Sequence, residues 1–312
     1  MDGKELGPFR LAPWFSVRPW GRLDLRPWYE STGTTEPVGE AWLTGPQSVV
    51  ETGAMAGETL AQVTAEAGEA LLGADGAEFP LLVKLLFPND KLSVQVHPDD
   101  AQAQAMGQPR GKTECWYVLE AEPGATIMLG LKQGATAEKV RAAIGDGTLE
   151  ELMEFVPVSA GDMVFVDAGT VHAIGPGVVL LETQQTCDIT FRMYDYGRPR
   201  ELHVEQALRV MKMQTNARKV KPKRIDGRTR LIEERYFTVD RYDLPANGEA
   251  AIPGRKPMCL VGLKGTAQVE SAIGEAVELL PGHAVVVPVS AGRVSVRSEP
   301  GAAFVRCFAP AG

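Results

Sequence analysis

The sequence predicts a mostly β protein, built as two small units of packed antiparallel strands with a few short helices. Short apolar runs recur along the chain and are bounded by Gly, Pro, Asp and Asn, a rhythm typical of sandwiches and barrels. Helical periodicity is confined to a few segments. A glycine–strand–turn pattern occurs twice, at residues 159–174 and 280–295, which indicates a duplicated unit.

The strand candidates are apolar runs separated by turn-forming residues. The run at residues 92–97 also alternates apolar and polar side chains, as a strand with one buried face does. We expect strands within residues 79–88, 92–97, 115–121, 125–131, 162–169, 178–185 and 188–196.

Two segments have helical patterns. Residues 136–156 predict two short helices broken at Gly145 and Gly147, and residues 200–213 predict a longer helix with an apolar stripe. The basic stretch that follows is interpreted as a solvated linker in preference to an anion-binding patch. We therefore expect a domain boundary near residue 220, with a catalytic domain at 1–220 and a second β domain at 221–312.

Composition and charge exclude several classes of protein. The 312 residues are 44% hydrophobic, enough for a sizeable core, and no run approaches the ~20 apolar residues that a membrane span needs. A net charge of -8 disfavours nucleic acid as a partner. The N-terminal segment lacks the apolar core of a signal peptide, and the four cysteines are far apart. We expect a cytoplasmic protein with free thiols.

The repeated pattern also resembles a known motif. Gly161, Asp167, Gly169 and His172 follow the spacing of the second cupin motif, with Asp167 where a proline usually stands. In the second copy Gly282 and Pro288 are present, but Arg293 or a neighbour occupies the histidine position. The resemblance implies two cupin-type, jelly-roll-like β-barrels, the first able to bind a metal and the second degenerate.

The candidate metal ligands are nitrogen and oxygen donors that come from several strands. Gln95 and His97 share one face of a strand, Glu114 lies on another, and His172 arrives in the cupin turn. Two imidazoles, a carboxylate and an amide oxygen without a thiolate suit a catalytic zinc site, or one for Mn, Fe, Co or Ni. His203 and His283 have no such partners, and we interpret them as structural or exposed.

Longer segments resemble one family closely. "FPLLVKLLFPNDKLSVQVHPDD", "GKTECWYVL", "VHAIGPGVVLLETQQTCDITFRMYDYGR" and "RELHVEQAL" are similar to the short bacterial form of type I mannose-6-phosphate isomerase, over roughly residues 10–215. The resemblance implies one Zn²⁺ per chain and interconversion of mannose 6-phosphate and fructose 6-phosphate through a cis-enediol. It carries over Gln95, His97, Glu114 and His172 as ligands and Arg192 as the signature arginine. The family's usual Trp-Gly-Gly is Trp20, Gly21 and Arg22 here, and there is no room for a separate helical domain.

Such an isomerase needs a base and groups that stabilise charge on the sugar oxygens. Glu182 has apolar neighbours, so burial should raise its pKa toward that of a working base; the alternative is a surface carboxylate. Arg192 can stabilise an enediolate oxygen. Lys112 points to the same side of its strand as Glu114. Lys84 interrupts an apolar run, where a structural ion pair is an equally good interpretation.

The sequence has no P-loop, since the spacing of its glycines before Lys112 is wrong. We expect discrete side chains to bind the phosphate of the small-molecule substrate: Arg198, supported by Ser93 and Lys112, with Lys84 as a further candidate.

The cupin pattern is also compatible with two other functions, a metal-dependent cupin oxygenase and a non-catalytic sugar-binding cupin. The first usually has a ligand set richer in histidine, and the second usually carries a basic helix-turn-helix that is not evident here. A monomer or a dimer is expected.

Overall fold

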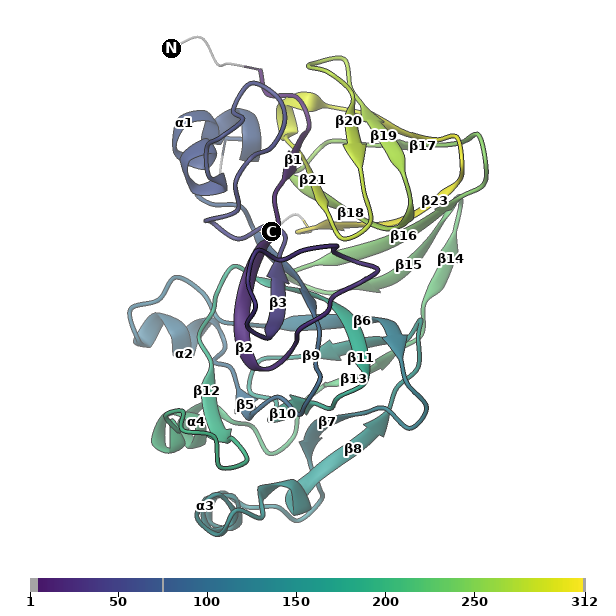
Figure 1. Ribbon diagram of the computed structural model, residues 1–312. Coiled ribbons are helices and arrows are strands. Elements are labelled where there is room, and N and C mark those ends of the chain that lie inside the picture. The colour runs from purple at the N-terminus through teal and green to yellow at the C-terminus, as the bar shows by residue number, and fades with distance from the viewer. Residues whose placement is uncertain (1–4, 75, 311–312) are drawn as a thin grey trace.

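The computed structural model describes residues 5–74 and 76–310 and has the mostly β architecture that was predicted (Figure 1). Its strands form four sheets, and the strand pairs within them are antiparallel. The sheets make two units, each with a larger and a smaller sheet that face each other across an apolar core. The units are jelly-roll-like, but no ladder joins the two sheets of a unit within the described chain.

The first unit contains the predicted strands. Its seven-stranded sheet has the order β13-β9-β6-β11-β4-β3-β2. The bounds are β2 Trp14–Arg22, β3 Val38–Trp42, β4 Leu81–Leu86, β6 Glu114–Ala121, β9 Met163–Val166, β11 Val178–Gln185 and β13 Arg218–Val220. The five-stranded sheet has the order β12-β5-β10-β7-β8. Its bounds are β5 Val94–Val96, β7 Thr126–Leu131, β8 Met153–Pro157, β10 His172–Ile174 and β12 Phe191–Tyr194.

The second unit repeats this plan. Its seven-stranded sheet has the order β1-β21-β18-β23-β16-β15-β14 and faces a four-stranded sheet, β17-β22-β19-β20. The larger sheet is made of β1 Phe9–Leu11, β14 Lys223–Ile225, β15 Arg228–Glu233, β16 Thr238–Leu244, β18 Met258–Gly265, β21 Ala284–Val287 and β23 Ala302–Phe308. The smaller sheet is made of β17 Gly248–Ile252, β19 Ala267–Glu270, β20 Val277–Leu279 and β22 Val294–Ser298.

The two large sheets pack back to back, which makes four layers. Successive side chains of a strand point to opposite faces. Trp116 of β6 therefore lies in the core of the first unit. Its neighbour Tyr117 belongs to a second cluster with Val261 and Val305 of the other large sheet. Central strands of the inner sheets, such as β4 and β11, are thus buried on both faces.

Helices are few and lie outside the sheets. They are α1 Leu60–Leu72, α2 Asp100–Ala105, α3 Ala137–Asp146 and α4 Val204–Val210, with short 3-10 turns η1 Leu149–Leu152 and η2 Val289–Ala291. Helix α1 was not predicted, although Thr59 and Gln62 form a capping box that marks its start. None of the helices in the described residues has the length and apolarity to cross a membrane.

The two predicted helical segments are shorter than expected. Within residues 136–156, α3 is followed by a 3-10 turn and then by strand β8. The helix predicted at 200–213 is restricted to α4. His203 is its N-cap residue and not a mid-helix residue, because its N–H donates to the carbonyl of Arg192 and holds the preceding segment against β12.

The registers of the two large sheets correspond residue by residue. Gly161 and Gly282 both have positive φ and begin equivalent turns. One row of partners in the first unit runs Val164, Trp116, Glu182, Lys84, Trp42. The equivalent row in the second runs Val285, Leu260, Arg306, Asp240, Arg230.

The basic stretch at 217–230 is not the solvated linker that was expected. It forms β13, β14 and the start of β15. Strand β13 pairs with β9 of the first unit and β14 pairs with β15 of the second. We propose that the domain boundary lies between them, near residue 220. Strand β1, from the N-terminal side, pairs across that boundary with β21.

Candidate metal centre and active site

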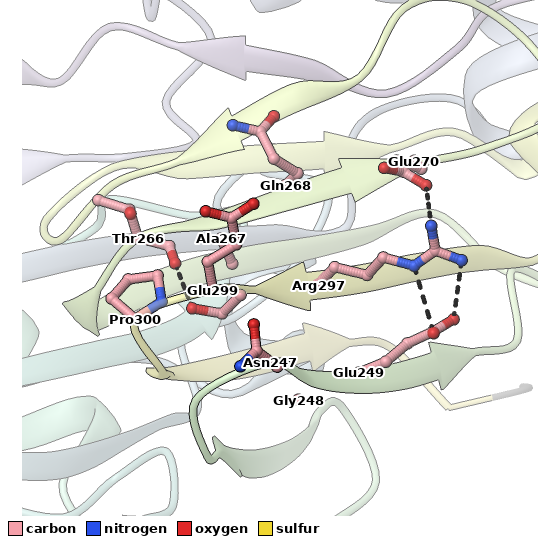
Figure 2. A pocket seen from close by; sticks show the side chains of 11 residues that line it. Asn247, Gly248, Glu249, Thr266, Ala267, Gln268, Glu270, Arg297, Glu299 and Pro300 are labelled. Atoms are coloured by element: carbon pink, nitrogen blue, oxygen red, sulfur yellow. Dashed lines mark hydrogen bonds and ion pairs between the residues drawn. The ribbon is translucent and has the colours of Figure 1, made fainter.

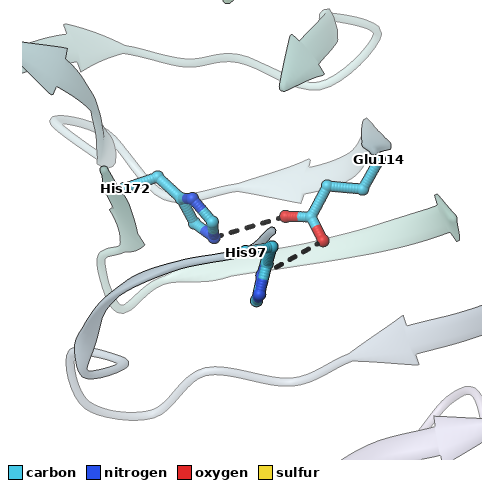
Figure 3. Close-up of side chains that lie close together, drawn as sticks. All are labelled: His97, Glu114 and His172. Atoms are coloured by element: carbon cyan, nitrogen blue, oxygen red, sulfur yellow. Dashed lines mark ion pairs between the residues drawn. The ribbon is translucent and has the colours of Figure 1, made fainter. Parts of the chain in front are cut away.

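Three predicted ligands converge inside the first unit (Figure 3). His97 follows β5, Glu114 begins β6 and His172 begins β10, so both sheets of the unit contribute. One donor atom from each residue lies within 4.8 Å of the other two. Glu114 Oε2 is 3.5 Å from His97 Nε2, and Glu114 Oε1 is 3.3 Å from His172 Nε2. This spacing leaves room for one cation among them.

The hydrogen bonds around this cluster set both imidazoles for coordination. His97 Nδ1 lies 2.8 Å from the carbonyl of Ile189, and His172 Nδ1 lies 2.9 Å from the carbonyl of Thr170. A carbonyl only accepts, so each Nδ1 carries the proton and each Nε2 offers a lone pair. Burial lowers the pKa of His97 well below its ordinary value and that of His172 to about 4, which keeps both rings neutral.

Unsatisfied polar atoms support a metal here. Among the described residues, His97 Nε2 and both carboxylate oxygens of Glu114 are buried without a hydrogen-bond partner. Such groups are costly unless a partner compensates them. A cation among them provides that compensation, so the residues present fit a bound metal.

Gln95 lies at the edge of this cluster. Its Nε2 is 3.3 Å from His172 Nε2. A half-turn of the terminal amide would place its oxygen on the same side, where it could act as a ligand. Gln95 also lines the neighbouring cavity, so it connects the metal cluster to the space where a substrate would bind.

That cavity has a volume of about 430 Å³, within the range of small-molecule sites. Six of the residues proposed from the sequence line it: Lys84, Ser93, Gln95, Lys112, Glu182 and Arg192. Residues that the sequence analysis did not single out also line it, among them Arg18, Glu40, Asp188 and Arg200.

Glu182 is a buried carboxylate at this cavity. Trp116 Nε1 donates to its Oε1 over 3.2 Å, and Lys84 Nζ lies 3.7 Å from its Oε2. Burial, together with the charge of Glu114, raises the pKa of Glu182 to about 7. A carboxyl group with that pKa can accept and return a proton near neutral pH. The alternative of a surface carboxylate does not describe this residue.

Lys84 satisfies both interpretations given for it, since it is paired and also lines the cavity. Its Nζ lies 3.9 Å from Glu40, 3.7 Å from Glu182 and 3.4 Å from Asp188, and 4.3 Å from the centre of the Trp42 ring. Burial alone would raise the pKa of Glu40, but the charges of Lys84 and Arg18 outweigh it and lower that pKa to about 2.

Lys112 is buried beside the metal cluster, with its Nζ 3.3 Å from Glu114 Oε2. Burial alone would lower its pKa, but the carboxylates of Glu114 and Glu182 outweigh that effect and raise it. The lysine is therefore a positive charge within the cavity wall.

The arginines differ from the expectation. Arg192 lines the cavity, and its Nη1 donates to the carbonyl of Glu201. Arg198 is absent from the lining, because its guanidinium already donates to Asp195, Asp90 and the carbonyl of Lys91. Arg200, two residues further on, lines the cavity instead. The sequence offered no signal that separates these two arginines.

A larger hollow, of about 570 Å³, lies on the second unit between β17, β19 and β22 (Figure 2). Arg297 pairs there with Glu249 and Glu270. Its lining contains no histidine or cysteine, so we assign it no chemistry.

Comparisons with known proteins agree on one family. Residues 9–129 match the family model "Phosphomannose isomerase type I, catalytic domain". A mannose-6-phosphate isomerase from Streptococcus mutans is 36% identical over 269 residues, 82% of this chain and 84% of that one. The mannose-6-phosphate isomerase ManA of Bacillus subtilis is 35% identical over 271 residues, 82% of this chain and 85% of its own.

Solved structures are similar as well. The crystal structure of a Bacillus subtilis mannose 6-phosphate isomerase has a TM-score of 0.86 and 28% identity, covering 97% of this chain and 100% of that one. A zinc-bound mannose 6-phosphate isomerase has a TM-score of 0.78 and 18% identity, covering 98% and 100%. At that identity the second likeness concerns the fold.

Proposed function

The chain belongs to the type I phosphomannose isomerase family, and on that premise we propose how its own residues interconvert mannose 6-phosphate and fructose 6-phosphate. It is an aldose–ketose isomerase. The observation that carries the assignment of its site is the buried cluster of His97, Glu114 and His172 beside a cavity lined by Glu182. An oxygenase or a sugar-binding cupin is not favoured, since the relatives are isomerases.

We place one zinc ion per chain between Gln95, His97, Glu114 and His172. A bound zinc ion supplies a positive charge that polarises the oxygens at the reacting end of the open-chain sugar. Gln95 is the ligand that also borders the cavity, so the sugar would approach the metal from its side.

Glu182 is our proposed base. Its carboxylate accepts the proton from C2 of mannose 6-phosphate, which leaves a cis-enediolate with the charge on O1. A proton then moves from O2 to O1 by way of the cis-enediol, and Glu182 returns its own proton to C1 to give fructose 6-phosphate. The hydrogen bond from Trp116 fixes the orientation of the carboxylate, and its pKa near 7 suits transfer in both directions.

Lys112 and Arg192 supply positive charge during this step. Arg192 is the register partner of Gln95 across β12 and β5, so the two side chains leave the sheet on the same side. We propose that Arg192 stabilises the developing charge on an enediolate oxygen. The positive charges of Lys112 and Lys84 stabilise the negative charge that develops at the reacting end of the sugar.

The phosphate of the substrate would bind to arginines of the cavity wall. Arg18, Arg192 and Arg200 all line the cavity, and guanidinium groups suit paired hydrogen bonds to phosphate. Arg200 replaces Arg198 as our main anchor, because Arg200 lines the cavity and Arg198 does not. Ser93 remains a supporting contact.

We propose a cytoplasmic enzyme whose partner is a small sugar phosphate and which acts as a monomer or dimer. The four cysteines are free thiols, and Cys115, Cys259 and Cys307 are buried.

A coupled assay tests the function. The protein should convert mannose 6-phosphate to fructose 6-phosphate, lose activity in a chelator and regain it when zinc is restored. Glucose 6-phosphate, the C2 epimer, serves as the comparison substrate. Absence of turnover in protein that contains one zinc per chain would overturn the proposal.

A further inference from the structure

A buried carboxylate outside the cavity holds the proposed phosphate anchor. Asp195 follows β12 and is 2% exposed. Its Oδ2 accepts from Arg200 Nε over 2.7 Å, and its Oδ1 accepts from Arg200 Nη2 over 2.6 Å. This is a bidentate pair, which fixes the plane of the guanidinium as well as its position. Asp195 itself is not among the residues that line the cavity.

The backbone between the two residues turns sharply to make this pair. Tyr196 and Gly197 have φ of 55° and 77°, two left-handed residues in succession. The turn is closed by the N–H of Arg198, which donates to the carbonyl of Asp195 over 3.0 Å. A tyrosine in this region is uncommon, and such residues persist where surrounding contacts hold them.

Arg198 ties the same turn to the cavity wall. Its Nη1 donates to Asp195 Oδ1 over 3.1 Å, and its Nη2 donates to Asp90 and to the carbonyl of Lys91. Lys91 lies two residues before Ser93, which lines the cavity. Asp195 therefore lies between two guanidinium groups. The group of Arg198 is bonded to Asp90 and Lys91, and the group of Arg200 lines the cavity.

The pair with Asp195 uses only part of the hydrogen-bond donors of Arg200. The carboxylate takes the edge formed by Nε and Nη2, which leaves the Nη1 side of the fork for a ligand. An arginine at the end of a flexible side chain would otherwise lose several rotamers when it binds phosphate. Because Asp195 already holds it, little of that ordering remains to be done when the substrate arrives.

We propose that Asp195 is a positioning residue for phosphate recognition, acting through Arg200. It neither touches the substrate nor takes part in the proton transfer. The inference rests on the proposed function and adds to it the group that holds Arg200 in place at the cavity.

The test compares Asp195→Asn with Arg200→Ala and with the double variant. The asparagine keeps the shape but removes the charge and one acceptor. The KM for mannose 6-phosphate and the inhibition constant of inorganic phosphate should both rise by about tenfold, the effect of one charged hydrogen bond. The kcat and the zinc content should stay near wild type. Glu201→Gln, an exposed carboxylate on the same segment, is the matched control and should change neither constant.

The double variant separates positioning from a general structural role. If Asp195 acts through Arg200, Asp195→Asn should add almost nothing once Arg200 is alanine. Additive effects would overturn the inference, as would unchanged constants in Asp195→Asn while Arg200→Ala raises them. If Arg200→Ala itself changes neither constant, the placement of the phosphate is wrong.

A second variant covers the case in which Asp195→Asn does not fold. Asp195→Glu keeps the charge but lengthens the arm, so it displaces the guanidinium. The KM and the phosphate inhibition constant should rise with kcat retained. Wild-type values in Asp195→Glu would overturn the inference.

Discussion

Lys84 and Glu182 are direct partners across β4 and β11, with 3.7 Å between Nζ and Oε2. Both side chains are buried at the wall of the cavity. Lys84 also forms ion pairs with Glu40 and Asp188. Its charge therefore offsets only part of the free energy that ionisation of the buried Glu182 costs. Burial, with the charge of Glu114, therefore keeps the pKa of Glu182 at about 7 despite a lysine beside it.

The second unit has the same pair with the charges exchanged. Asp240 lies opposite Arg306 in the equivalent row, and the two side chains are 2.5 Å apart. Asp240 is also paired with Arg228 and Arg230. Following the same registers, Met258 occupies the place of Glu114. The second unit therefore has a salt-bridge cluster where the first has its proposed catalytic groups.

The first prediction concerns the metal ligands. His97→Ala or His172→Ala should lose zinc and nearly all turnover, and Glu114→Gln should weaken zinc retention because it removes the anionic ligand. Elemental analysis measures the zinc. His283→Ala, in the second unit, is the control and should keep one zinc and full activity. Full zinc occupancy in His172→Ala would contradict the assignment of the metal ligands.

The second prediction concerns the base. Glu182→Gln keeps the shape but cannot accept a proton, so kcat should fall by about 10²–10⁴-fold. The KM and the zinc content should change little. Substrate deuterated at C2 should lose its label to solvent, or pass it to C1, with wild type but not with the variant. Undiminished label movement in Glu182→Gln would mean that another group carries the proton.

The pH profile supplies a third prediction. The base works only when ionised, and burial raises the pKa of Glu182, so kcat should fall as the pH drops below about 7. Measurement at saturating substrate keeps the second ionisation of the free sugar phosphate, near ~6, out of the profile. An acidic limb of the kcat profile with an apparent pKa near ~4.3, the ordinary value for glutamate, would contradict the assignment.

A fourth prediction separates two roles of Arg192. Arg192→Lys keeps a positive charge but loses the planar fork. If Arg192 stabilises the enediolate, kcat and kcat/KM should fall together, by about 10–100-fold. A raised KM with unchanged kcat would instead place Arg192 on the phosphate of the ground state.

The fifth prediction concerns stability of the second unit. Asp240→Asn would leave Arg228, Arg230 and Arg306 without their shared carboxylate. Removal of one partner from a buried ion pair typically costs about 3–5 kcal/mol. We expect a lower Tm in calorimetry, with the kcat of the folded protein unchanged. An unaltered Tm would show that the cluster contributes little to stability.

Much of the site could be predicted because it depends on local periodicity. Alternation along a strand places Gln95 and His97 on one face and links Lys112 to Glu114, whatever the rest of the fold does. The cupin spacing likewise identifies His172 before any packing is known. The sequence by itself therefore determined the mostly β class and brought out the candidate metal ligands, of which His97, Glu114 and His172 lie together in the structure.

Other features depend on contacts between segments that are distant in sequence. The sequence alone does not distinguish Arg198 from Arg200. In the structure Arg198 pairs with Asp90, more than a hundred residues earlier, whereas Arg200 lines the cavity. The raised pKa of Glu182 likewise needs the burial and the charges that four strands bring together. Charge and desolvation act through space, so the tertiary structure alone decided which side chains are available for chemistry.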